Sequence, residues 1–304
     1  HYYFYALFDT FELPSGGGAG AMAGLVVVFD FDKTIIDWDS DNWVVEELGV
    51  KDLFTQLLPT MPWNSLMDTM MRELHSRGKT IEDIAECLKK IPLHPNIASA
   101  IKSAHAFGCD LRVLSAANEF FIDTILKHHG LMDCFSEINT NPSIIDEQGR
   151  LRILPYHDFH SSSHGCTICP PSMCKGLIME KIQASVAADG KKHKQFIYVG
   201  DGAPDFCAGL KLEEGDFLMP RRDFPIWDLI SANPLFTKAK IYEWNECDEL
   251  GAVLLNTVNA FFTANKSRST DQLVPVDCKS QNSSTCLTAH EAFQNALPVP
   301  LPRQ

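Results

Sequence analysis

The sequence predicts an α/β fold, in which a Rossmann-like parallel sheet is flanked by helices and a small helical cap is inserted after the first strand. Three short apolar runs predict the sheet: Leu25–Phe29, residues 111–114 and residues 196–199. None of them alternates polar and apolar side chains, which is typical of strands that helices bury on both faces. Segments with helical spacing follow the runs, as successive βα units require.

The segments between and after these strands are predicted to be mainly helical. After the first run, helical spacing covers residues 43–58, 63–76 and 80–90, which form a predicted cap at about residues 38–93. Residues 96–107 then return the chain to the sheet. Turn signals such as Asn141-Pro142 predict a loop and a hairpin over residues 135–160. The other predicted helices cover residues 118–129, 173–188, 204–210, 227–230 and 250–262.

The composition predicts a single main domain with unlike segments at both ends. Residues 1–21 are aromatic and then Gly-rich, and we expect a disordered extension or tag, with Met22 as the natural start. Residues 22–265 form the predicted domain. Residues 266–304 are rich in Ser, Thr, Gln and Pro, which predicts a disordered tail. The first segment lacks the basic region of a signal peptide, so we expect a cytoplasmic protein.

Charge and hydropathy exclude several classes of partner. The chain of 304 residues has a formal net charge of −13 and no run of Lys or Arg, which argues against nucleic acid and anionic membranes. No apolar run is long enough to span a bilayer. We therefore expect a small-molecule partner, and the sequence leaves the oligomeric state open.

Polar side chains end each of the three predicted strands. Asp30, Ser115 and Asp201 come directly or almost directly after them. Ligands of open α/β sheets bind outside the carboxyl ends of the strands, so these three side chains should converge. Asp30 and Asp32 form a pair in which one carboxylate can attack while the other transfers protons. A carboxylate that attacks an anionic phosphoryl group needs a compensating cation, and Mg²⁺ prefers such oxygen ligands.

Four motifs in order resemble those of haloacid-dehalogenase-like phosphatases. They are DFDKT at residues 30–34, the strand LRVL ending at Ser115, SMCKG at residues 172–176 and GDGAPD at residues 200–205. Residues 24–263 as a whole resemble the phosphoethanolamine/phosphocholine phosphatase family. The resemblance is greatest to its plant branch, whose members are described as inorganic pyrophosphatases or thiamine-monophosphate phosphatases.

The resemblance implies a role for each motif residue. Asp30 would attack phosphorus and form an aspartyl-phosphate, and Asp32 would protonate the leaving group and then activate water. Thr34 would orient this pair by hydrogen bonding. Ser115 and Lys175 would bind phosphoryl oxygens and offset the developing charge.

The metal and supporting residues follow from the same motifs. Asp30, the backbone carbonyl of Asp32 and Asp201 would hold Mg²⁺, and Asp205 would support the metal waters or Lys175. Asn118 closes the second motif and is a candidate substrate contact. The substrate would be a small phosphorylated metabolite, such as phosphoethanolamine, phosphocholine, thiamine monophosphate or pyrophosphate. The alternative is a phosphate-binding protein without turnover, which the intact Asp30 and Asp32 pair disfavours.

Two features bear on the choice of substrate. Asp37 lies in an acidic stretch that suits the start of a helix, but it is also a candidate to bind a substrate cation. The residue after the second-motif Ser is typically Asp in the family, whereas this chain has Ala116. If that Asp helps to hold an amine head group, Ala116 removes the advantage of choline and ethanolamine esters.

A cluster of cysteines and histidines precedes Lys175. Cys166 and Cys169 form a Cys-x-x-Cys pair that could bind zinc, but the sequence shows no second pair at matching spacing. We therefore expect a metal-free packed loop, with a metal site as the alternative. The other members of the cluster are Cys174, His157, His160 and His164.

Overall fold

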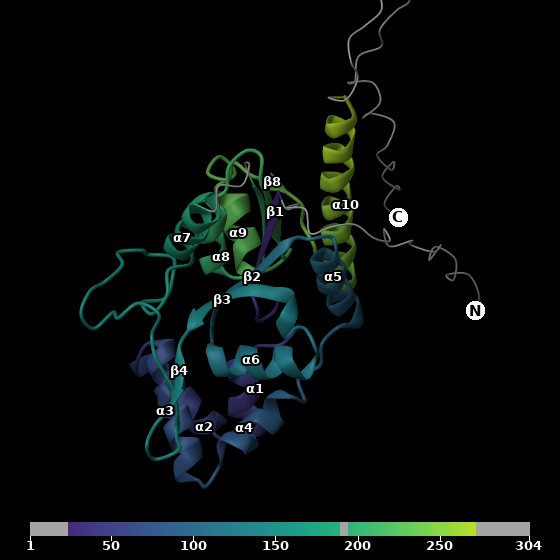
Figure 1. The fold of residues 1–304 in the computed structure, drawn as a ribbon. Coiled ribbons are helices and arrows are strands. Elements are labelled where there is room, and N and C mark those ends of the chain that lie inside the picture. The colour runs from purple at the N-terminus through teal and green to yellow at the C-terminus, as the bar shows by residue number, and fades with distance from the viewer. Residues whose placement is uncertain (1–23, 189–193, 272–304) are drawn as a thin grey trace, which may run out of the picture. The chain divides into compact units, whose positions relative to one another are not determined.

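The computed structural model describes residues 24–188 and 194–271 (Figure 1). The chain divides into two compact units, residues 1–262 and 263–304, and the first unit contains the whole sheet. Among the described residues, no helix is long and apolar enough to cross a membrane.

A six-stranded parallel sheet is the centre of the first unit, with the strand order β3-β2-β1-β6-β7-β8. The chain builds outward from β1 in one direction through β2 and β3, and in the other through β6, β7 and β8. The order therefore reverses between β1 and β6, where Phe29 pairs with Val199. Such a switch point is where open α/β sheets bind their ligands. The strands are β1 (Leu25–Phe29), β2 (Asp110–Asn118), β3 (Phe135–Asn141), β6 (Gln195–Gly200), β7 (Phe217–Pro220) and β8 (Lys240–Ile241).

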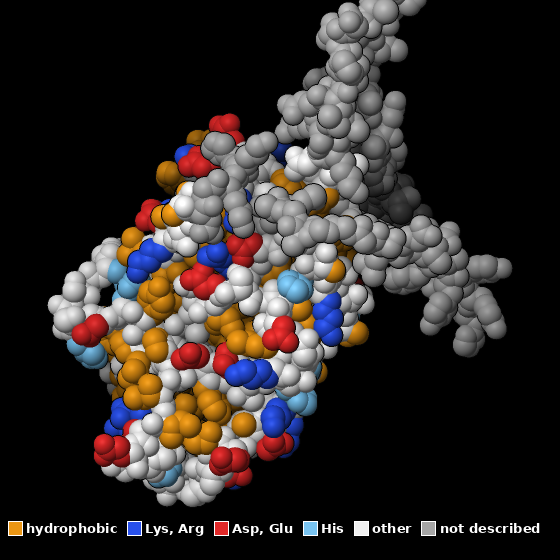
Figure 2. Space-filling model, in the orientation of Figure 1, with side chains coloured by type: hydrophobic (Ala, Val, Ile, Leu, Met, Phe, Trp, Pro, Cys, Tyr) orange, Lys and Arg blue, Asp and Glu red, His pale blue; other side chains and the backbone are white. Residues whose placement is uncertain are grey.

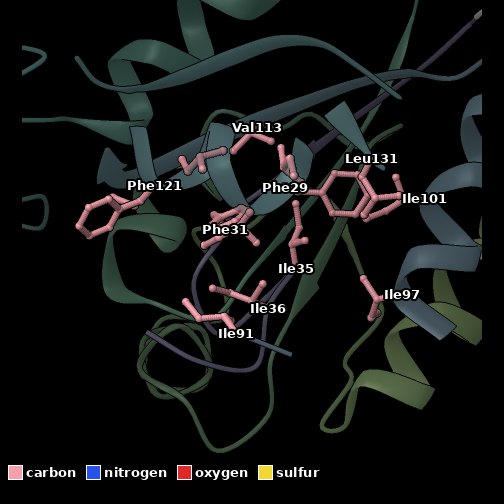
Figure 3. Packing of buried hydrophobic residues seen from close by; sticks show 14 of the residues in the cluster. Phe29, Phe31, Ile35, Ile36, Ile91, Ile97, Ile101, Val113, Phe121 and Leu131 are labelled. Atoms are coloured by element: carbon pink, nitrogen blue, oxygen red, sulfur yellow. The ribbon is translucent and has the colours of Figure 1, made fainter. Parts of the chain in front are cut away.

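Helices bury both faces of this sheet, which explains the unbroken apolar run of β1. Leu25, Val27 and Phe29 face one core cluster, whereas Val26 and Val28 face a second. The first core includes residues of α5 (Pro95–Ala106), α6 (Glu119–His128) and α10 (Cys247–Asp271). The second includes residues of α7 (Lys175–Ala188), α8 (Ala203–Gly209) and α9 (Pro225–Ala232). Figure 3 shows the first core around Phe29 and Phe31, at the end of β1 that leads into the site.

Four helices lie between β1 and α5, as the predicted cap requires, and Figure 1 shows them gathered at one end of the unit. The single helix predicted over residues 43–58 is wrong, because the chain breaks at Gly49. This glycine has φ +75°, a left-handed conformation that ends a helix and that other residues adopt only with strain. The four helices are α1 (Ser40–Glu47), α2 (Lys51–Leu57), α3 (Trp63–Ser76) and α4 (Ile81–Leu88).

The prediction missed strands at both edges of the sheet. Residues 135–160 contain the predicted hairpin, formed by β4 (Ser143–Ile145) and β5 (Leu151–Ile153), but they begin with β3, which joins the main sheet. The edge strands β7 and β8 were also not predicted. β2 continues to Asn118, so Ser115 lies inside a strand and not after it. Short 3₁₀ turns complete the fold at Leu58–Thr60 and Met132–Cys134.

The predicted end segments fall largely outside the described residues. The proposed extension over residues 1–21, with Met22, lies wholly outside them. α10 continues to Asp271, so the predicted boundary after residue 265 falls within a helix. On the face drawn in Figure 2, basic side chains are scattered among acidic ones, and hydrophobic side chains gather near β4, where Ile144 and Ile145 are exposed.

Candidate active site

Asp30 lies at the switch point of the sheet, one residue beyond β1. Its backbone N–H donates to the carbonyl of Val199 at 2.8 Å, which extends the β1–β6 ladder to the edge of the site. The residue is 7% exposed. The turn that follows contains Lys33 at φ 57°, and this left-handed residue redirects the chain toward α1. Asp30 is thus held by the sheet itself, whereas the residues after it belong to a loop.

The cation of the site is Lys175, the first residue of α7. Its Nζ lies 2.7 Å from Asp30 Oδ1 and 2.6 Å from Asp205 Oδ1, and the residue is 2% exposed. A buried ammonium is tolerated only when it is paired and hydrogen-bonded. Burial lowers the pKa of Lys175, but the charges of Asp205 and Asp30 outweigh burial and raise it. Lys175 therefore stays charged beside Asp30.

Asp205, fully buried in the first turn of α8, holds Lys175 in place. Its Oδ1 also accepts a hydrogen bond from Tyr198 Oη at 2.6 Å. Its Oδ2 accepts from the backbone N–H groups of Asp201 at 3.1 Å and Gly202 at 2.7 Å. Sequence reasoning did not find Tyr198, which lies in the apolar run of β6. The only signal was the general one that a buried Tyr hydroxyl needs a partner.

Three carboxylates meet here with only one described cation in contact. Asp30, Asp201 and Asp205 each offer an oxygen, and these oxygens lie within 4.8 Å of one another. Burial, then repulsion by Asp205, raises the pKa of Asp30 to about 6, although Lys175 opposes the shift. Burial and the charges of Asp30 and Asp205 raise the pKa of Asp201 to about 8. Uncompensated negative charge on oxygen ligands fits a hard divalent cation.

Asp32 is half-buried and faces the start of the helical segment. Ser40 donates to it twice, from the backbone N–H to Oδ1 at 3.1 Å and from Oγ to Oδ2 at 3.2 Å. Burial, followed by the charges of Asp39 and Asp41, raises the pKa of Asp32 well above its usual range. A carboxyl group with a raised pKa keeps its proton to higher pH than usual, which suits a general acid.

Three other predicted site residues, Thr34, Ser115 and Asn118, differ in their hydrogen-bond partners. Thr34 Oγ1 donates to Asp201 Oδ1 at 3.4 Å, so its recorded partner is the third carboxylate and not the Asp30 and Asp32 pair. Ser115 is buried, and its Oγ accepts from the backbone N–H of Ala117 at 3.3 Å. Asn118 caps α6 through Oδ1, while its buried Nδ2 has no partner among the described residues.

Asp37 is paired with a residue that sequence reasoning did not single out. Its Oδ1 lies 2.7 Å from Arg221 Nη2. Arg221 is buried, donates to the carbonyl of Lys33 at 2.7 Å and stacks on the rings of Phe224 and Trp244. The acidic start of α1 is explained by Asp39, which caps the helix by accepting from Asn42. The charge of Asp37 is therefore largely neutralised within the protein.

The cysteine and histidine cluster separates in the structure. Cys166, Cys169 and Cys174 come together, and Cys207 of α8 joins them. His164 Nε2 lies 2.9 Å from the carbonyl of Pro170, and its Nδ1 accepts a hydrogen bond from the backbone N–H of Cys166 at 3.1 Å. Among the described residues, no group of potential metal ligands includes a histidine.

With this geometry established, comparison with known proteins identifies the family. Residues 25–258 match the family model described as "Putative Phosphatase". The chain belongs to this phosphatase family. The phosphatase is 53% identical over 277 residues to inorganic pyrophosphatase 2 of Arabidopsis thaliana, covering 91% of this chain and 96% of the relative. It is also 53% identical over 238 residues to a thiamine phosphate phosphatase-like protein of Arabidopsis thaliana, covering 78% and 97%.

The fold is shared with a solved phosphatase. A substrate-bound complex of phosphoserine phosphatase aligns with a TM-score of 0.51 and 19% identity, covering 78% of this chain and 99% of that chain. The parallel sheet flanked by helices confirms the predicted fold class. The resemblance to haloacid-dehalogenase-like phosphatases is confirmed as well, and the chain is a phosphatase.

Proposed function

We propose that this phosphatase hydrolyses small phosphate esters or pyrophosphate with Mg²⁺, through an aspartyl-phosphate on Asp30. The contact between Asp30 and the buried Lys175, at 2.7 Å, carries the proposal. Lys175 holds the carboxylate at the carboxyl end of β1 and supplies positive charge where a phosphoryl oxygen would bind. Such fixed charge stabilises a transition state better than water, because it needs no reorganisation.

The two carboxyl groups of the first motif divide the chemistry. Asp30 attacks phosphorus as an anion, and the bond between phosphorus and the leaving oxygen breaks. Asp32 gives its proton to that oxygen, a role that its raised pKa supports. Asp32, now ionised, then takes a proton from the water that attacks phosphorus and releases phosphate from Asp30.

The remaining residues bind and orient. Ser115 and Lys175 would contact phosphoryl oxygens, and the free Nδ2 of Asn118 is a further donor for the substrate. Asp30, Asp201 and the backbone carbonyl of Asp32 would hold Mg²⁺, which would supply neutralising charge to the phosphoryl group. Asp205 acts through Lys175, and Thr34 acts through Asp201.

The charges around the site favour pyrophosphate or neutral esters over amine esters. Asp37, the candidate to receive a substrate cation, is already paired with Arg221. Ala116 supplies no carboxylate where the family typically has one. The name of the relative inorganic pyrophosphatase 2 agrees with this preference.

The Asp30→Asn variant tests the proposal. The amide keeps the shape of the side chain but cannot attack phosphorus, so phosphate release with Mg²⁺ should fall by several orders of magnitude. Phosphate release is measured over a panel of small esters and pyrophosphate, alongside the thermal transition of each protein. Asp52→Asn, an exposed substitution on α2, is the matched control. Turnover near the wild-type rate in a folded Asp30→Asn protein would refute the mechanism.

A further inference from the structure

We propose that four cysteines beside the active site bind a structural zinc ion. Each offers one sulfur, and these atoms lie within 4.8 Å of one another. Three of the four residues are buried and one is half-buried. All four are free cysteines, and they belong to a separate small core cluster. The proposed ligands are Cys166, Cys169, Cys174 and Cys207.

The spacing of the sulfur atoms suits a tetrahedral metal. A zinc ion with bonds of about 2.3 Å to four thiolates places the sulfurs about 3.8 Å apart. Cys207 Sγ lies 3.8 Å from Cys166 Sγ and 4.0 Å from Cys174 Sγ. A disulfide would need about 2.05 Å, so neither contact is a bonded pair.

One backbone amide and the N-terminus of α7 lie beside the sulfurs, an arrangement that suits thiolates. The N–H of Cys169 donates to Cys166 Sγ at 3.4 Å. Cys174 immediately precedes the first turn of α7, and Gly176 of that turn packs against Cys207. Helix N-terminal amides stabilise negative sulfur, and zinc binds the thiolate form of cysteine.

Gly176 allows the close approach on which the site depends. A Cβ at this position would lie 2.6 Å from Cys207 Sγ and 3.0 Å from the carbonyl oxygen of Cys207. Any other residue would push α8 away from the start of α7. The fourth ligand therefore reaches the cluster only because residue 176 has no side chain.

This arrangement revises the expectation of a metal-free loop. That expectation rested on the lack of a second pair matching Cys166 and Cys169 in the sequence. The second pair is Cys174 and Cys207, which the packing of α7 against α8 brings together.

The position of the proposed ion gives it a structural role. Cys174 immediately precedes Lys175, and Cys207 lies two residues after Asp205. A bound zinc would join the start of α7 to α8, and with them the buried pair of Lys175 and Asp205. Zinc here would fix the helices that carry this pair without taking part in the reaction.

Metal content tests the proposal directly. The full chain is produced with zinc in the medium, purified without chelator and dialysed against Mg²⁺ buffer before elemental analysis. We expect one zinc per wild-type chain and loss of most of it in Cys166→Ser and in Cys207→Ser. Cys134→Ser, a buried cysteine outside the cluster, should keep its zinc. The double variant Asp30→Asn/Asp201→Asn should keep it too, which separates this site from the carboxylates.

A second measurement uses the wild-type protein alone, so it does not depend on whether a variant folds. Wild-type protein loaded with Co²⁺ should show thiolate-to-cobalt charge-transfer absorption and the intense visible bands of a tetrahedral site. Several results would overturn the proposal: wild-type protein without zinc, iron in its place, zinc retained in the cysteine variants, or disulfides among the four cysteines by non-reducing mass spectrometry.

Discussion

Replacing Asp205 by Asn should destabilise the protein and move its pH profile. The carboxylate accepts hydrogen bonds from Lys175, Tyr198 and two backbone amides, and it is fully buried. An amide can accept on one side only, and its NH₂ group would face either the Lys175 ammonium or those backbone N–H groups. Breaking a buried ion pair costs about 3–5 kcal/mol. In the variant, Lys175 still has Asp30 as an ion-pair partner, at 2.7 Å in this structure, so we expect a cost at the lower end of this range.

A loss of about 3 kcal/mol corresponds to a fall in Tm of roughly 6–12 °C for a domain of this size. Thermal unfolding of the metal-free protein at pH 7 measures it, with the exposed Asp228→Asn of α9 as control. Asp205 also raises the pKa of Asp30, so its loss should move the acid limb of kcat/KM to lower pH. A Tm and a pH profile equal to those of the wild type would refute the role given to Asp205.

Two further predictions concern the cation and the substrate. The pKa values of Asp30, about 6, and Asp201, about 8, lie above the unfolded value of 3.8. In this range the folded metal-free protein binds more protons than the unfolded chain, so it should lose stability as the pH rises from the unfolded value of 3.8 toward the folded values of about 6 and about 8. Mg²⁺ must displace these protons to bind. Its Kd, measured by calorimetry, should therefore fall from pH 6 to pH 8, by up to about tenfold per pH unit for each proton displaced. A Kd independent of pH would contradict the metal assignment. Ala116→Asp should raise kcat/KM for phosphocholine and phosphoethanolamine relative to pyrophosphate by roughly tenfold, or about 1.4 kcal/mol. An unchanged ranking would show that residue 116 has no part in selectivity.

The sequence predicted the strands and site residues that depend on local sequence pattern and on the topology of parallel sheets. The apolar runs of β1, β2 and β6 are buried on both faces and do not alternate polar with apolar side chains, so the sequence alone identified them as strands. Asp30 and Asp201 were placed together because the carboxyl ends of parallel strands share one edge. The edge strands were missed because β3 mixes polar with apolar residues and β8 consists of only Lys240 and Ile241.

The parts that were missed depend on long-range packing. Tyr198 looks like one more apolar strand residue until its hydroxyl meets Asp205. Arg221 carries no local signal, and its role appears only when the chain brings it to Asp37 and the carbonyl of Lys33. Cys207 lies 33 residues from Cys174, at no spacing that a zinc motif would suggest.

Chemical trapping of the phosphorylated enzyme tests the central claim most directly. The enzyme is mixed with a good substrate and Mg²⁺, quenched with acid and reduced with borohydride, which converts an aspartyl-phosphate into homoserine. Peptide mass spectrometry then locates the modified residue. The mechanism predicts homoserine at position 30, absent without substrate. Modification of another residue, or none during rapid turnover, would contradict the assignment of Asp30 as the nucleophile.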